Sequence, residues 1–178
     1  MVKTLRFISG YVIGIAIFLI LVPYGFFALS KLDYLVDYKM LINSMVLRMV
    51  VSGILLLIGA IFMMWSNIFL FLVGKGGPAD AMGVSISPRT EKLVTRGPYR
   101  FCRHPMVFGA LCVYLSLVIF MNSVIGLLAL LILICLAAIY LRNSEEKRLL
   151  KDFGDEYLEY KKKVPMLFPL IKFRKSRV

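Results

Sequence analysis

The chain has 178 residues, of which 60% are hydrophobic and 18% are charged, and its mean hydropathy is +0.84. This apolar share is well above that of soluble domains and excludes an ordinary water-soluble protein, so we expect an integral membrane protein. The net charge of +12 fits a positive cytoplasmic face and anionic lipid as the partner, with no nucleic acid expected. Cys102, Cys112 and Cys135 lack the close spacing of metal ligands, so we expect no metal site.

Three uncharged runs predict the membrane-spanning helices, and they cover residues 7–30, 49–74 and 105–141. A span needs roughly 20 apolar residues, so the first two runs predict one span each. The third run is too long for one span, and a polar break at 121–123 divides it into helices over 105–121 and 124–141. The predicted fold class is all-α: a polytopic membrane protein with about four transmembrane helices, the last two forming a tight hairpin.

The distribution of Lys and Arg predicts the orientation. Two lie before the first span, six lie between residues 75 and 103, and eleven follow residue 141, whereas three occupy the loop between the first two spans. Basic residues near span ends favour the cytoplasmic side. We therefore expect both termini in the cytoplasm, with the protein in a prokaryotic cell membrane, or in the endoplasmic reticulum of a eukaryote.

Two segments on this side carry candidate chemistry. Residues 74–87, "GKGGPADAMGVSIS", are rich in glycine and polar residues and predict a loop that could order over a ligand. The basic segment "RGPYRFCRHPM" follows and ends where Pro105 opens a helix. Proline suits the first helical turn, and the free N–H groups there favour an anion such as a carboxylate. An interfacial anchor would explain the basic and aromatic residues equally well.

The segment after the hairpin, "RNSEEKRLLKDFGDEYLEYKKKVP", predicts an amphipathic cytoplasmic helix that bends near Gly154. Its lysines at 161–163 are interpreted as lipid-facing charge. Glu145 and Glu146 could be favourable first-turn charges of this helix. Because the hairpin brings its two ends together, we expect them instead beside Arg103 and His104, where both signs of charge suit a zwitterion.

These motifs resemble the superfamily of isoprenylcysteine carboxyl methyltransferases and phospholipid methyltransferases. The resemblance is carried by "LVTRGPYRFCRHPM", by "EEKRLLKDFGDEYLEYKKKVP" and by "GKGGPADA", and it extends over residues 74–169. It implies a helical membrane enzyme that uses S-adenosylmethionine and takes a lipophilic or prenylated substrate from the bilayer. Val107 stands where many members have tyrosine. The resemblance implies that the cofactor-binding residues are Tyr99, Arg103, His104, Pro105, Gly109, Glu145 and Glu146.

We expect methyl transfer that depends mostly on positioning and on exclusion of water. A carboxylate acceptor, as in an isoprenylcysteine-like substrate, needs only a cation to aim it, and Arg142 or Arg100 are the candidates. An amine acceptor, as in a phospholipid, needs its proton removed by Glu145 or Glu146. A thiol lies between these cases.

Two other classes of function stay open at this point, namely a nicotinamide-dependent sterol-type reductase and a non-catalytic membrane scaffold. The sequence also predicts two regions. Residues 1–73 form an N-terminal helical pair, and residues 74–178 form a methyltransferase core. The oligomeric state is left open.

Overall fold

The computed structural model describes residues 12, 14, 16–35, 41–75, 80–81, 84–85 and 90–169. Most of the predicted ligand-covering loop and the first residues of the first predicted span, with Lys3 and Arg6 before it, lie outside these residues. From the predicted loop the structure describes two short antiparallel strands, β1 (Asp80–Ala81) and β2 (Val84–Ser85).

The other secondary-structure elements of the described chain are helices. The first helical stretch comprises η1 (Ala16–Leu21), α2 (Val22–Ser30) and η2 (Lys31–Leu35). The second comprises α3 (Met45–Phe69) and η3 (Leu70–Gly74), and a short turn, η4 (Gly97–Arg100), precedes the third, α4 (Pro105–Met121). The fourth comprises α5 (Val124–Tyr140), η5 (Leu141–Glu145) and α6 (Glu146–Lys163), and a kink at Gly154 divides α6.

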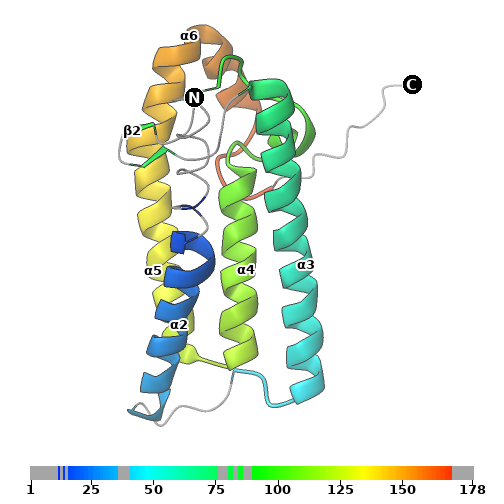
Figure 1. Ribbon diagram of the computed structural model, residues 1–178, viewed down its shortest axis with the longest axis vertical. Helices are drawn as coiled ribbons and strands as arrows, with labels where there is room; N and C mark the ends of the chain where they lie inside the picture. The colour runs from blue at the N-terminus through cyan, green and yellow to red at the C-terminus, as the bar shows by residue number, and fades with distance from the viewer. Residues whose placement is uncertain are drawn as a thin grey trace, which may run out of the picture.

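Helix α4 is the centre of the bundle. It runs antiparallel to α3 and α5 and parallel to α2, and it packs against all three helices (Figure 1). Its buried residues lie along its whole length, from Pro105 to Val118. The outer helices instead expose large apolar side chains, such as Val46 and Leu57 on α3 and Ile132 on α5. In a chain of this composition these faces meet lipid, where helices satisfy their own backbone groups.

The predicted hairpin is confirmed, and its turn is built by polar side chains. Asn122 ends α4 in the left-handed conformation, with φ of 57°, and the Ser123 hydroxyl caps α5 by accepting from the Gly126 N–H at 2.8 Å. The Asn122 side chain also accepts from the Ile42 N–H at 3.0 Å. Asp33 of η2 accepts from the Ile125 N–H at 2.9 Å. These contacts tie the first loop to the hairpin turn at one end of the bundle.

Two glycines let α3 and α4 approach closely. A Cβ on Gly59 would lie 2.6 Å from the Gly109 carbonyl oxygen, and a Cβ on Gly109 would lie 2.7 Å from the Gly59 oxygen. Small residues of this kind let membrane helices pack backbone to backbone, where van der Waals contact replaces the hydrophobic effect. The α3–α4 pair is therefore the tightest contact of the bundle.

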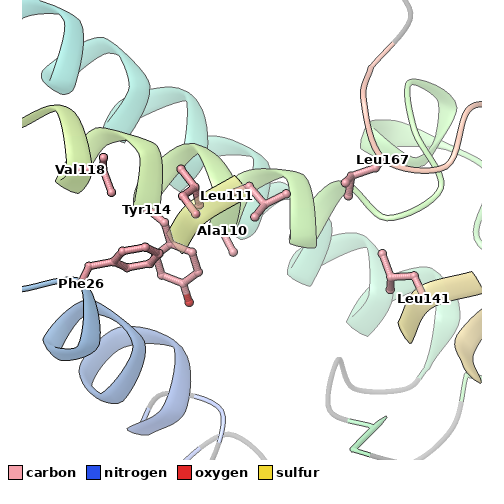
Figure 2. Close-up of a cluster of buried hydrophobic side chains, with 8 residues drawn as sticks. Phe26, Ala110, Leu111, Tyr114, Val118, Leu141 and Leu167 are labelled. Carbon is pink, nitrogen blue, oxygen red and sulfur yellow. The ribbon is translucent and has the colours of Figure 1, made fainter. Parts of the chain in front are cut away.

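The opposite face of α4 packs against α2 and α5. Figure 2 shows Phe26 of α2 against Tyr114 of α4, with Leu111 and Val118 on the same helix, and the Phe26 and Tyr114 ring centroids lie 5.6 Å apart. The Tyr114 hydroxyl donates to the carbonyl of Phe18, which lies in η1, at 2.9 Å. This bond satisfies a polar group inside an otherwise apolar layer.

The all-helical class is confirmed, and the span count needs one refinement. In the described residues three helices are long and apolar enough to cross a membrane: Ala16–Leu35, Met45–Gly74 and the one beginning at Val124. Helix α4 is shorter, with 17 residues, because Pro105 opens it and Asn122 ends it. At 1.5 Å per residue it covers about 26 Å, slightly less than the roughly 30 Å of a hydrocarbon core.

The predicted bend in the last helix is also confirmed. Gly154 has φ of 51° and ψ of −127° within α6, a conformation that is open to glycine and strained for other residues. The second half of α6 thereby folds back over the end of the bundle at which α4 begins (Figure 1).

Candidate functional site

The segment before α4 is fixed on α3 by aromatic packing. Gly97 has φ of 62° and lies so close to the Phe69 ring that a Cβ would come within 2.6 Å of it. Trp65 and Phe101 pack with ring centroids 6.1 Å apart. The glycine-proline turn predicted from the sequence is therefore a packed 3-10 turn whose following residues enter α4 in a fixed orientation.

The chain after α6 returns to the same segment. The Arg103 N–H donates to the Pro165 carbonyl at 2.9 Å, and the His104 N–H donates to the Met166 carbonyl at 3.0 Å. Leu167, the next residue, is buried in the same apolar cluster as Leu141. The two residues before α4 are therefore held from both sides, by α3 and by the returning chain.

A buried ion-pair cluster forms where these elements meet. Arg103 and Glu146 are both buried, and the Arg103 guanidinium contacts Glu146 Oε1 in an ion pair that lacks the alignment of a hydrogen bond. Lys161 Nζ lies 2.7 Å from the other carboxylate oxygen, Oε2. The Arg103 Nη1 also donates to the Lys161 carbonyl at 3.1 Å. Glu146 therefore has both oxygens engaged by cations from two separate elements.

His104 and Glu145 form a second pair beside the first. His104 Nδ1 lies 3.2 Å from Glu145 Oε2, and the His104 side chain is only 5% exposed. A carboxylate at Nδ1 favours the tautomer with its proton on that nitrogen, which leaves Nε2 as the reactive atom of the ring. Nε2 is buried and finds no hydrogen-bond partner in the part of the chain that the structure describes.

Three tyrosines line this cluster. The Tyr160 hydroxyl donates to the Tyr99 carbonyl at 2.5 Å, and the Tyr157 hydroxyl is buried within the electrostatic reach of Glu146. Burial raises the pKa of the Tyr99 phenol far above its usual value, and the nearby Tyr160 and Glu145 raise it further. The phenol is therefore neutral at physiological pH.

The cysteine of the basic segment, Cys102, is a buried thiol. Burial raises the pKa of the Cys102 thiol to about 12, and the side chain is completely buried. The thiolate form is the nucleophile, so the buried thiol is a poor one and its side chain packs beside the site.

The structure brings most of the predicted site residues together. Tyr99, Arg103, His104, Pro105, Glu145 and Glu146 meet at one end of the bundle. Gly109 lies apart from the polar cluster, in the α3–α4 contact, where its lack of a side chain is needed for packing. The guanidinium of Arg100 lies 4.6 Å from the centroid of the Phe101 ring, and Arg142 lies in η5. Both arginines are exposed.

The prediction that all three lysines at 161–163 are lipid-facing charge is wrong for Lys161. Lys161 was expected to face lipid like its two neighbours, whereas its ammonium reaches the buried Glu146 carboxylate. Lys162 and Lys163 do lie at the surface, where both pair with Glu159. The three lysines differ in their partners only because of how α6 folds. The charge pattern of the sequence therefore does not distinguish Lys161 from Lys162 and Lys163.

Sequence comparison identifies the class of this helical membrane bundle, which carries a charged cluster at one end, as a membrane methyltransferase. The family model described as phospholipid methyltransferase matches residues 47–156. The chain belongs to this family of S-adenosylmethionine-dependent enzymes. The match runs from α3 through the hairpin and into α6, so it includes the pairs Arg103–Glu146 and His104–Glu145, whereas Lys161 lies beyond its last residue. The reductase and scaffold alternatives are thereby set aside.

Curated relatives match a shorter stretch. The protein-S-isoprenylcysteine O-methyltransferases of Mus musculus and Rattus norvegicus are each 38% identical over 88 residues, which is 47% of this chain and 29% of theirs. The chain thus matches less than a third of the length of these relatives. No solved structure is significantly similar to the chain.

Proposed function

We propose that the protein transfers a methyl group from S-adenosylmethionine to a lipophilic acceptor at the membrane interface, and that the acceptor is the carboxylate of an isoprenylcysteine-like substrate. The observation that carries this proposal is the paired arrangement of His104 with Glu145 and of Arg103 with Glu146 at the end of an apolar bundle. Family membership supplies the reaction class. The names of the curated relatives supply the acceptor class.

The residues of this cluster fit the amino-acid end of S-adenosylmethionine. Glu145 has an oxygen that the His104 contact does not use, and its side chain is 23% exposed, so it can accept from an ammonium group. The buried Nε2 of His104 has no partner among the described residues and can bond to a ligand. Unpartnered buried polar atoms are rare in proteins, and one at this position is accounted for by a ligand.

The N-terminus of α4 completes the fit. Pro105 is its first residue and has no N–H, and the next two residues, Met106 and Val107, have N–H groups with no helical acceptor. His104 precedes them and provides no side-chain cap. These amides and the positive end of the helix dipole suit a carboxylate, since the dipole at a helix N-terminus favours negative charge.

The remaining predicted residues have supporting positions in this proposal. Tyr99 and Pro105 shape the site wall, and Arg103 and Glu146 hold the two segments together. Gly109 is proposed to act only through the α3–α4 packing that places the start of α4.

When bound, S-adenosylmethionine supplies an electrophilic methyl group on a positively charged sulfur. The protein contributes position and a site with little water, since the cluster residues Arg103, His104 and Glu146 are all buried. A carboxylate acceptor requires no proton removal, only a cation to orient it. The exposed guanidinium groups of Arg100 and Arg142 are the candidates for this role.

An amine acceptor is the alternative, and the description of the family model as phospholipid methyltransferase favours it. An amine must lose a proton, and Glu146 is a poor base because two cations already engage its oxygens. Glu145 and the Glu145-oriented ring of His104 are the groups able to accept that proton. A thiol acceptor would need the same help to a lesser degree.

The acceptor class can be read from the chemistry of the product. The purified protein is incubated with methyl-labelled S-adenosylmethionine and, in separate reactions, a prenylcysteine analogue, an ethanolamine phospholipid and a small thiol. We expect label in the prenylcysteine product that mild alkali releases as methanol, as for a methyl ester. Alkali-stable label in the phospholipid would establish amine methylation and overturn the carboxylate assignment.

The orientation is part of the proposal. We infer a cytoplasmic position for the end of the bundle that carries the cluster, because the basic residues between 90 and 103 and those from 142 to 163 gather there. This places the site next to the soluble pool of S-adenosylmethionine.

A further inference from the structure

We infer that Lys161 is a positioning residue of the methyltransferase site, which acts by holding Glu146 so that the adjacent Glu145 faces His104 and the ligand. This inference rests on the proposed function. It assigns different roles to the two glutamates, with Glu146 as the anchor of the site and Glu145 as the carboxylate in contact with ligand.

The engagement of Glu146 is the first argument. Its side chain is 3% exposed, and one oxygen contacts Arg103 while the other lies 2.7 Å from Lys161 Nζ. A carboxylate with both oxygens engaged by cations has little capacity left for a third charged partner. Glu145 is 23% exposed, and among the described residues its one ion pair is with the imidazole of His104. Of the two carboxylates, Glu145 is therefore the one available to an ammonium group.

Lys161 reaches this anchor through two separate contacts. Its ammonium pairs with Glu146, and its carbonyl accepts from the Arg103 guanidinium at 3.1 Å. It therefore fixes both members of the buried pair at once. Glu145 immediately precedes Glu146 at the end of η5, so any shift of Glu146 moves Glu145 relative to His104.

The sequence separation of Glu146 and Lys161 shows that their ion pair depends on the bend of α6 at Gly154. Glu146 and Lys161 are 15 residues apart, and on a straight helix that separation would place them about 22 Å apart along the axis. They meet because Gly154, with φ of 51°, reverses the helix between them. The Tyr160 bond to the Tyr99 carbonyl holds the folded half of α6 against the segment before α4.

Lys162 is a matched control provided by the chain. It has the same side chain and lies one residue away, but it is 70% exposed and pairs with the surface residue Glu159. Lys161 is 44% exposed, so replacement of either lysine leaves the apolar core intact. Surface ion pairs such as the Lys162 pair contribute little to stability.

The test compares Lys161→Met, Lys161→Arg and Lys162→Met, and it includes Lys161→Met in a Glu146→Gln background. Calorimetry in detergent measures S-adenosylmethionine binding, and thermal unfolding checks the fold. We expect Lys161→Met to weaken binding about tenfold, as for loss of one partner of a partly buried charge pair. Lys161→Arg and Lys162→Met should stay within about twofold of the original protein. In the Glu146→Gln background, Lys161→Met should add no further loss.

A second readout works without any ligand. Hydrogen exchange followed by mass spectrometry reports the peptide that contains Glu145 and Glu146, and we expect faster exchange in Lys161→Met but not in Lys162→Met. Equal exchange in these two variants overturns the positioning role, as does a Lys161→Met loss of binding that adds fully to that of Glu146→Gln. If the unsubstituted protein binds no S-adenosylmethionine, the proposed function fails, and the exchange comparison still decides the role of Lys161.

Discussion

The bend at Gly154 offers the sharpest test of how α6 builds the site, through the substitution Gly154→Ala. No atom lies within 4 Å of a Cβ built on Gly154, so the substitution causes no clash and acts through the backbone alone. A non-glycine residue held at φ of 51° and ψ of −127° costs on the order of 1–3 kcal/mol. Alanine also favours a continuous helix over glycine by about 1 kcal/mol.

These terms sum to about 2–4 kcal/mol in favour of a straight α6, which shifts the equilibrium between bent and straight forms roughly 30-fold to several hundred-fold. Because the straight form separates Lys161 from Glu146, we expect Gly154→Ala to weaken S-adenosylmethionine binding at least as much as Lys161→Met. Spin labels at the exposed positions Lys147 and Lys162, in a background without the native cysteines, measure the bend directly by electron paramagnetic resonance.

The matched control is Gly53→Ala on α3, where a Cβ also meets no atom within 4 Å and the backbone is helical. We expect Gly53→Ala to leave cofactor binding unchanged and the label distance short, whereas Gly154→Ala lengthens it toward the roughly 22 Å of a straight helix. The same short distance in both variants would refute the argument that glycine is required at the bend.

Three further predictions concern the cluster, the packing and the topology. His104→Ala and Glu146→Ala should each weaken S-adenosylmethionine binding more than tenfold in calorimetry, since loss of one member of a buried charge pair costs about 2–5 kcal/mol; unchanged affinity in both would contradict the site. Gly109→Leu should lower the thermal midpoint of unfolding by several degrees, because its Cβ would lie 2.7 Å from a backbone oxygen of the facing helix. Gly25→Leu is the control and should leave the midpoint unchanged, because a Cβ at Gly25 meets no atom within 4 Å. A cysteine at Asn122 should label only from the non-cytoplasmic side, and reporter fusions at both termini should read as cytoplasmic; the reverse pattern would invert the proposed orientation.

The helices of the hairpin could be predicted from the sequence almost to the residue. The prediction of 105–121 matches α4, and the prediction of 124–141 ends one residue beyond α5. Local chemistry explains this success, because Pro105 permits a helix start, Asn122 accepts the left-handed conformation, and Ser123 caps the next helix. Each of these signals acts within a few residues of its position.

The meeting of His104 with Glu145 and of Arg103 with Glu146 was also predictable, since an antiparallel hairpin returns its two ends to one place. The role of Lys161 was not, because it depends on one backbone reversal at Gly154 that a charge pattern does not encode. Gly109 shows the opposite problem. The family motif predicts that Gly109 belongs to the cofactor site. In the structure the need for glycine at this position comes from its close packing against Gly59 of α3.

The division of the chain at residue 73 stays a prediction. The cofactor-binding roles predicted for Tyr99 and Pro105 and the orienting roles predicted for Arg100 and Arg142 stay predictions as well. Arg100 and Arg142 are exposed, so they can be replaced without disturbing the buried cluster. A loss of activity in these two variants would therefore report on substrate orientation.

The most direct test of the central claim is methyl transfer in a membrane. The purified protein is reconstituted in lipid vesicles that contain a total lipid extract and a prenylcysteine analogue, and methyl-labelled S-adenosylmethionine is added. Methyl transfer is measured as label that enters the organic phase, and mass spectrometry identifies the labelled product. We predict that label enters a lipophilic product with the unsubstituted protein and with Lys162→Met, and that His104→Ala removes nearly all of it. Two results would contradict the account. One is methyl transfer by His104→Ala that equals that of the unsubstituted protein. The other is a folded unsubstituted protein that neither transfers the methyl group nor binds the methyl donor.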